Sequence, residues 1–295
     1  MMAGFIMAGR MQAAVFVIAS TLLTLVMPPF LVFSNAAIAL ITLRKGWQQG
    51  IVFALIATAT LIILGVTRNQ GIGSGLLAGL VTWLPIVVVA SVLAITNSWE
   101  KTLQLILLVA IVGVLVFHLI HSDTVAFWIQ VLEPVKPLLQ SGYDFSDTKI
   151  DEAINNVSQW LTGAFTAGIA LIAIISLIIA RNWQAILYNP GGFGEEFRQI
   201  RLGKQVTIGL LVGIAIAVLT KSQMMTELIM VTLAVFMFQG ISLVHAIVKQ
   251  REMGQGWLIA FYVLMLLLLI QMIVLLASFG IIDNFVNFRK KTAIK

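Results

Sequence analysis

Residues 72–95 read IGSGLLAGLVTWLPIVVVASVLAI, a run of twenty-four residues without a charged side chain. A helix needs about 20 apolar residues to cross the roughly 30 Å hydrocarbon core of a bilayer, so this run predicts a transmembrane helix. Composition extends the same conclusion to the whole chain. Of its 295 residues, 60% are hydrophobic and 10% are charged, whereas an ordinary soluble domain carries about 25% charged residues. The sequence therefore predicts an integral membrane protein.

Similar apolar runs lie on both sides of residues 72–95. The candidate segments are Gln12–Met27, Phe30–Leu43, Gly50–Val66, Ile72–Ile95, Thr102–Ile120, Trp160–Ala180, Val206–Leu219, Thr226–Val248 and Trp257–Phe279. Open strands cannot satisfy their backbone in lipid, and these runs lack the alternation of a barrel. The predicted fold is all-α, a polytopic helical membrane bundle of eight or nine transmembrane segments. One or two of them, Phe30–Leu43 and Val206–Leu219, are expected to be short or re-entrant.

Lysines and arginines in short loops indicate orientation, because they accumulate on the cytoplasmic side. With a cytoplasmic amino terminus and nine crossings, ten basic residues lie inside: Arg10, Arg44, Lys45, Lys101, Arg181, Arg198, Arg201, Lys204, Lys249 and Arg251. Four lie outside: Arg68, Lys136, Lys149 and Lys221. The tail residues Arg289, Lys290, Lys291 and Lys295 would then also lie outside, against the rule. Eight crossings would correct the tail but move Lys249 and Arg251 outside, so both counts stay open. We expect a multi-pass protein of the bacterial cytoplasmic (inner) membrane.

Two loops are long enough to matter within the single membrane domain expected over residues 1–295. Residues 122–157 carry six acids and two lysines, a net charge of −4, which predicts an extracytoplasmic loop. Residues 182–205 form the other loop, which is cytoplasmic in the nine-crossing arrangement. There Phe193, Phe197 and Ile200 recur at helical spacing, which predicts a short helix lying on the membrane surface or on a partner.

Glycines recur every fourth residue in two of the segments. Gly71, Gly75 and Gly79 lie in one segment, and Gly209 and Gly213 lie in another. Small residues at this spacing let two helices approach closely in lipid. The pattern favours packing within the bundle, with docking of a second membrane subunit as the alternative.

A few polar or helix-breaking residues interrupt the apolar runs and are candidates for a ligand-binding pocket. Pro85 removes a helical hydrogen bond near the middle of its segment, and such breaks often line binding sites. Polar groups within the bilayer should face the bundle interior or a cavity. The predicted ligand-binding residues are Asn35, Trp83, Pro85, His118, Gln239, Ser242 and His245. The alternative interpretation is that the polar members make ordinary hydrogen bonds between helices.

Several functions lack the residues that they require. All twelve acidic residues fall in loops or at segment edges, whereas ion-coupled carriers usually hold the ion on a buried carboxylate. The sequence has no Walker A motif and no catalytic signature for intramembrane hydrolysis. It has no cysteine, and His118, His121 and Asp123 lack a fourth metal ligand. We therefore expect no enzyme, no cofactor and no metal, and we interpret the net charge of +6 as a sign of orientation rather than of nucleic-acid binding.

Several short motifs resemble the YybS-like family of uncharacterised bacterial inner-membrane proteins. They are Pro28-Pro29 before a segment ending Leu43-Arg44-Lys45-Gly46, Asn189-Pro190-Gly191-Gly192-Phe193, Glu195-Glu196-Phe197, Gln239-Gly240 with His245, Gly280-Ile281-Ile282-Asp283, and Phe288-Arg289. That family in turn resembles the substrate-binding (S) components of energy-coupling-factor vitamin transporters. The resemblance implies a membrane coupling subunit with a separate ATPase as partners. The chain departs from S components in its number of segments, because those proteins typically have six and eight or nine are predicted here.

Three hypotheses follow. The first is a membrane subunit that binds an unknown small molecule between its helices, as a transporter component energised by a partner. The alternative is a membrane scaffold or assembly protein that acts through its acidic loop and surface helix. The third is an intramembrane enzyme acting on a lipid, for which His118 or His245 would be the base.

Overall fold

The computed structural model describes residues 2–69, 71–142 and 146–291, and no strand occurs within these ranges. Asp144 and Lys295, which entered the charge counts above, lie outside the described residues. The chain is thus all-helical wherever it is described, as expected from its uninterrupted apolar runs.

Within the described ranges, six helices are long and apolar enough to cross a membrane. They are α4 (Trp47–Thr67), α5 (Gly71–Thr96), α6 (Trp99–Ile120), α10 (Leu161–Tyr188), α13 (Gln223–Gln250) and α15 (Leu269–Val286). Four other helices match predicted segments but are shorter: α2 (Arg10–Thr24), α3 (Leu31–Lys45), α12 (Lys204–Thr220) and α14 (Gly256–Leu267). A 15-residue helix such as α2 spans only about 22 Å. By length and composition, six crossing helices are therefore supported rather than eight or nine.

The segment Trp257–Phe279 was predicted as one helix, and the structure differs. The chain breaks at Leu268, which has φ −124° and ψ 43°, and two helices result, α14 and α15. The surrounding run Leu264–Ile270 contains only leucine, methionine and isoleucine, so no proline or glycine marks the break.

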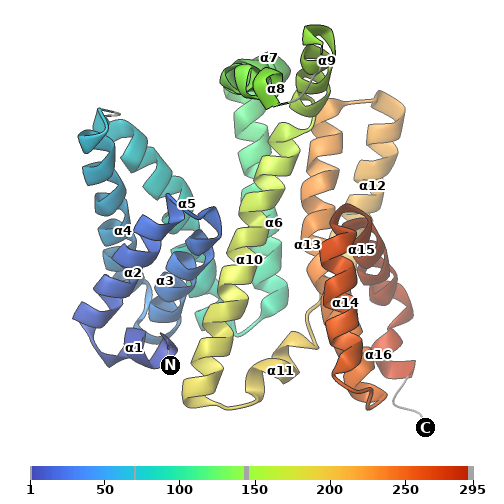
Figure 1. The fold of residues 1–295 in the computed structure, drawn as a ribbon. Helices are drawn as coiled ribbons and strands as arrows, with labels where there is room; N and C mark the ends of the chain where they lie inside the picture. Colours follow the sequence, from blue (N-terminus) through green and yellow to red (C-terminus); the bar gives the residue numbers. More distant parts are fainter. Residues whose placement is uncertain (1, 70, 143–145, 292–295) are drawn as a thin grey trace.

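The remaining helices are short. They are α1 (Met2–Ala8), η1 (Pro28–Phe30), α7 (Thr124–Leu132), η2 (Glu133–Val135), α8 (Lys136–Gly142), α9 (Asp147–Ser158), α11 (Gly192–Phe197) and α16 (Phe288–Lys291). Figure 1 shows α1–α5 as one group, α6 and α10 in the middle, and α12–α16 as a second group. Helices α7–α9 form a cap at one end of the molecule, and we call this segment, residues 121–160, the cap.

Both α1 and α16 lie at the end opposite the cap (Figure 1). The amide Nε2 of Gln250, at the end of α13, donates to the carbonyl of Arg289 at 3.0 Å, so these two helix ends lie side by side. The same end carries the connections from α3 to α4, from α5 to α6, from α10 through α11 to α12, and from α13 to α14. We call it the basic end. The C-terminal helix thus joins the basic connections, and the conflict that nine crossings created for the tail does not arise.

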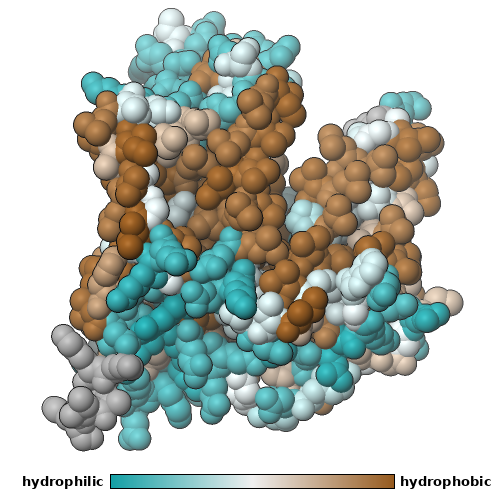
Figure 2. Space-filling model, turned by 180° about the vertical axis from the view of Figure 1, so that it is seen from behind, coloured by the Kyte–Doolittle hydropathy of each residue, from teal (hydrophilic) through white to brown (hydrophobic). Residues whose placement is uncertain are grey.

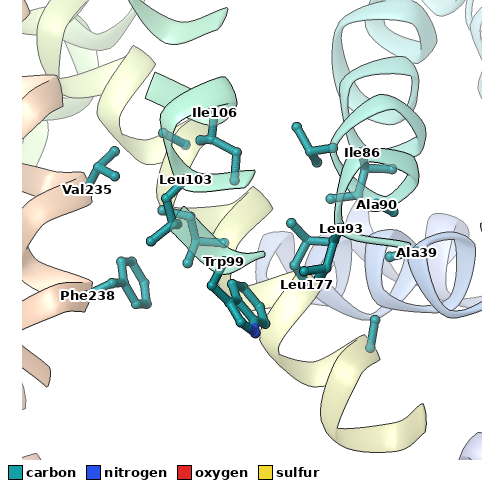
Figure 3. Packing of buried hydrophobic residues seen from close by; sticks show 14 of the residues in the cluster. Ala39, Ile86, Ala90, Leu93, Trp99, Leu103, Ile106, Leu177, Val235 and Phe238 are labelled. Carbon is teal, nitrogen blue, oxygen red and sulfur yellow. The ribbon is translucent and has the colours of Figure 1, made fainter. Parts of the chain in front are cut away.

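The core is apolar and surrounds α13, the most deeply buried of the long helices. Val235 and Phe238 of α13 face Leu103 and Ile106 of α6 (Figure 3). Trp99 closes this layer near the basic end. Since lipid is as apolar as these side chains, close packing and dispersion rather than a hydrophobic driving force hold such helices together.

The closest helix contacts occur at glycines. A Cβ atom on Gly240 of α13 would lie 2.1 Å from the carbonyl oxygen of Leu276 in α15. A Cβ atom on Gly280 would lie 2.9 Å from the carbonyl oxygen of Phe236. These two helices therefore touch backbone to backbone.

The predicted glycine groove lies between α4 and α5. A Cβ atom on Gly75 would lie 2.8 Å from the backbone N and Cα of Ile62, and one on Gly79 would overlap the Thr58 side chain. Gly71 is used differently, since it opens α5 with φ +76° and its Cβ position is free of neighbours. Gly75 and Gly79 therefore pack within the chain.

Gly75→Leu is expected to destabilise the bundle by at least about 3 kcal/mol, because overpacking against a fixed backbone cannot relax. The measurement is size-exclusion chromatography and thermal melting of the detergent-purified protein. Gly73→Leu is the matched control, because the Cβ position of Gly73 on the same helix has no neighbour within 4 Å in the part of the chain that the structure describes. A well-folded Gly75→Leu protein that has lost only a partner would instead support the docking interpretation.

Candidate functional site

An apolar cleft of about 640 Å³ lies between α5, α6, α10 and α7 of the cap. Figure 2 shows a hollow between the group α1–α5 and the rest of the molecule, with hydrophobic side chains on both walls. We call this cavity the cleft. Its lining includes Val81, Pro85, Val89, Gly113, Phe117, Trp128, Thr162, Phe165 and Thr166. Hydroxyl groups of the two threonines and the indole of Trp128 are the polar side-chain groups in that set.

Pro85 is the one predicted ligand-binding residue that lines the cleft. It lies inside α5, where its ring nitrogen cannot donate to the carbonyl of Val81. Val81 also lines the cleft. The proline within the helix and the cavity therefore coincide, and a ligand-binding role for Pro85 stays a prediction.

An aromatic cluster closes the cleft beneath the cap. The indole Nε1 of Trp128 in α7 donates to the Thr162 hydroxyl of α10 at 2.9 Å. The Phe117 ring of α6 lies 5.2 Å from that of Phe127 and 5.9 Å from that of Trp128. These contacts fix α7 to both walls of the cleft.

A buried carboxylate lies next to the part of α10 that lines the cleft. Glu227 of α13 is fully buried, and its Oε2 lies 2.6 Å from Nε2 of His118. Gln223 donates to its other oxygen at 3.1 Å. A Cβ atom on Gly163 would lie 2.9 Å from the Glu227 backbone, and Gly163 directly follows Thr162 of the cleft. Glu227 lies near a helix end, as predicted, but it is enclosed by protein rather than placed at an exposed edge.

The predicted polar stripe on α13 binds a segment of the chain itself. The Oε1 of Gln239 accepts a hydrogen bond from the amide of Leu202 at 2.8 Å, and its Nε2 donates to the Gly280 carbonyl at 2.7 Å. Ser242 donates to the carbonyl of Phe197 at 2.6 Å. Both side chains are fully buried. The stripe therefore holds the connection between α11 and α12 against the bundle.

This connection was predicted to carry a surface helix, and the structure differs. Helix α11 ends at Phe197, and the following residues Ile200 and Leu202 are buried. The side chains of Phe197 and Ile200 lie in the hydrophobic core, and Ser242 and Gln239 bind backbone groups of Phe197 and Leu202.

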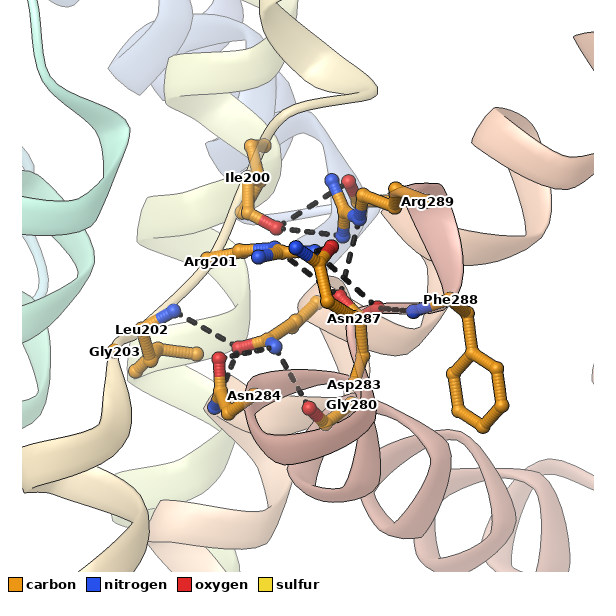
Figure 4. Close-up of polar contacts among 12 residues, drawn as sticks. Ile200, Arg201, Leu202, Gly203, Gly280, Asp283, Asn284, Asn287, Phe288 and Arg289 are labelled. Carbon is orange, nitrogen blue, oxygen red and sulfur yellow. Dashed lines mark hydrogen bonds and ion pairs between the residues drawn. The ribbon is translucent and has the colours of Figure 1, made fainter. Parts of the chain in front are cut away.

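A second fully buried acid, Asp283 of α15, was not predicted as a site residue. Its carboxylate lies 3.2 Å from Arg201 Nε and 3.1 Å from Arg289 Nε (Figure 4). Arg289 also donates to the carbonyls of Ile200, at 2.9 Å, and Arg198. Burial lowers the pKa of Arg289, and the charge of Asp283 opposes that shift. One carboxylate thus balances two guanidinium groups and ties α15 and α16 to the connection.

The other predicted residues lie apart. The Trp83 indole donates to Ser34 at 3.2 Å, Asn35 is buried with no partner for its Oδ1 among the described residues, and His245 Nε2 lies 2.8 Å from the Tyr262 hydroxyl. The predicted ligand-binding residues therefore do not share one cavity.

The second glycine set, Gly209 and Gly213, lies on α12. Their Cβ positions have no neighbour within 4 Å among the described residues, so that face of the helix is open within the chain. Whether a second membrane subunit docks there stays a prediction.

These features define a multi-pass helical membrane protein. The chain belongs to the family of predicted membrane proteins DUF2232, whose sequence model matches residues 13–284. No curated protein and no solved structure matches the chain.

Proposed function

We propose that the protein is a membrane subunit that binds an apolar small molecule in the cleft between α5, α6, α7 and α10. The observation that carries the proposal is the cleft itself, about 640 Å³ and lined mainly by apolar side chains. Ligand pockets fall in the range of roughly 300–1,000 Å³ and combine apolar walls with a few polar groups. A hydrocarbon-like molecule suits these walls, because they offer it close packing and dispersion contacts and few polar groups.

The proposal includes transport driven by a partner, a location in the bacterial inner membrane with the basic end in the cytoplasm, and no enzymatic activity. Support comes from the resemblance to S components of energy-coupling-factor transporters, from the missing ATP-binding motif and from the basic connections at one end. The expected absence of an enclosed acid no longer supports it, because Glu227 and Asp283 are fully buried. In the proposed topology α4, α5, α6, α10, α12 and α13 cross the membrane. The pairs α2–α3 and α14–α15 enter it and return to the basic end, although α15 is long enough to cross.

The scaffold alternative depended on two exposed surfaces, the acidic loop and the predicted surface helix, and the second is not exposed as expected. Phe197, Ile200 and Leu202 are buried in the bundle and are not displayed to a partner. The acidic cap is the surface on which a scaffold function would depend.

Gly113→Phe is expected to exclude the ligand, because Gly113 lines the cleft and no described residue lies within 4 Å of its Cβ position. The added ring fills the cavity without displacing the backbone. Mass spectrometry of molecules that co-purify in mild detergent measures the amount of the bound species, normalised to bulk lipid. This amount should be at least tenfold lower in Gly113→Phe than in the parent.

Gly168→Phe is the matched control, because the Cβ position of Gly168 on α10 also contacts none of the described residues and Gly168 is not among the residues that line the cleft. It should retain the species that the parent retains. Equal retention by Gly113→Phe, or no enriched species in the parent, would contradict the proposal.

A further inference from the structure

A second cavity, of about 260 Å³, lies at the basic end and differs from the cleft in its chemistry. Its charged lining residues are Glu195 and Arg198 around the end of α11, Lys249 at the end of α13, and Arg289 of α16. Three basic groups and one acidic group give the cavity a net charge of +2. We call it the basic pocket.

The basic side chains of this pocket differ in whether they already form hydrogen bonds or ion pairs within the chain. Arg289 is held by Asp283 and by two backbone carbonyls, and its side chain is 11% exposed. By contrast, no hydrogen bond or ion pair within the described residues involves the side-chain nitrogens of Arg198 or Lys249. The pocket therefore presents two uncommitted cations beside a third that is fixed in place.

The acidic residues near the basic pocket do not neutralise all of its positive charge. Asp283, the buried acid next to the pocket, already serves both Arg201 and Arg289. Glu195 is exposed and lies in no ion pair among the described residues. An anionic group entering the pocket would gain charge-assisted hydrogen bonds without displacing an existing ion pair.

The pocket also lies at the level where membrane helices end. Lys249 and Gln250 are the last two residues of α13, and Trp257 at the start of α14 is 63% exposed. Exposed tryptophan is typical of the membrane–water interface. Basic pockets between helices on the cytoplasmic side bind phosphorylated lipid headgroups.

We propose that the basic pocket binds a phosphate group, carried by an anionic phospholipid headgroup or as free phosphate, between Arg198 and Lys249. Arg198 offers the planar fork that suits two phosphate oxygens, and Lys249 adds a point charge. The site is separate from the cleft, so it stands whether or not the cleft binds an apolar ligand.

The test uses the full-length protein in nanodiscs of phosphatidylcholine containing a minor fraction of phosphatidylglycerol. Arg198→Gln with Lys249→Gln should lower the retained phosphatidylglycerol at least tenfold by native mass spectrometry. The charge-matched control is Arg10→Gln with Lys101→Gln, two exposed basic residues of the same end that do not line the pocket. It should retain phosphatidylglycerol as the parent does. Melting curves of both variants check that each is folded.

A second arm adds inorganic phosphate to protein purified in a neutral detergent. Saturable phosphate binding that the pocket variant loses identifies free phosphate as a ligand, whereas lipid retention without phosphate binding identifies the headgroup. The proposal is overturned if the pocket variant binds both probes like the parent, or if the control variant loses as much binding as the pocket variant.

Discussion

Asp283→Ala is expected to reduce the free energy of unfolding by about 3–5 kcal/mol, the usual cost of removing one partner of a buried ion pair. The substitution leaves the guanidinium groups of Arg201 and Arg289 next to each other without the carboxylate that both contact. It also removes the acceptor for the amide of Phe288. The melting temperature of the protein in mild detergent should fall by about 10 °C.

Glu195→Ala is the matched control, because Glu195 is an exposed acid near the same end with no ion pair among the described residues. It should melt within about 2 °C of the parent, as surface changes generally cost little. Adding Arg201→Met to Asp283→Ala should recover part of the loss, since it removes the excess positive charge. A melting temperature of Asp283→Ala equal to that of the control would refute this account of the cluster.

Gly240→Leu is expected to prevent α13 and α15 from packing. Even the first added carbon would lie 2.1 Å from the carbonyl oxygen of Leu276, a distance at which backbone must move. Because α13 is the central helix of the bundle, the cost should exceed the 1–3 kcal/mol of ordinary overpacking. We expect the protein to elute as aggregate in size-exclusion chromatography and to show no cooperative melting.

Gly209→Leu provides the comparison for this second prediction, since it makes the same change on a membrane helix whose Cβ position is free. It should elute at the parent volume. Gly240→Leu with the elution volume and melting of the parent would show that the two helices do not meet as described.

The helices could be predicted because each apolar run carries its own signal. All nine predicted runs are helical, and four of the six long helices, α4, α5, α6 and α13, extend at least to both predicted ends. The break at Leu268 could not be foreseen, because leucines and isoleucines on both sides favour one continuous helix. Similarly, length alone did not reveal that Ile200 and Leu202 are buried in the bundle.

The candidate sites depend on contacts between distant segments, which the identity of single residues does not predict. Gln239 and Ser242 were recognised as an inward-facing polar stripe, but their partners are mainly backbone groups of residues 197–202 and 280, which carry no side-chain signal. Glu227 and Asp283 lie near helix ends, so their position along the sequence predicted an exposed edge. The cleft depends on how α5 stands relative to α6 and α10, which local patterns do not determine.

The arrangement of the ends bears on how the chain enters its membrane. With the basic end in the cytoplasm, as proposed, the cap is the long segment that must be translocated, and residues 122–157 within it carry a net charge of −4. An inside-negative membrane potential acts on each charge with about 2.3 kcal/mol per 100 mV, and it drives negative charge outward. Export of the cap would thus be assisted electrically, and dissipating the proton-motive force during synthesis should slow its appearance on the outer face.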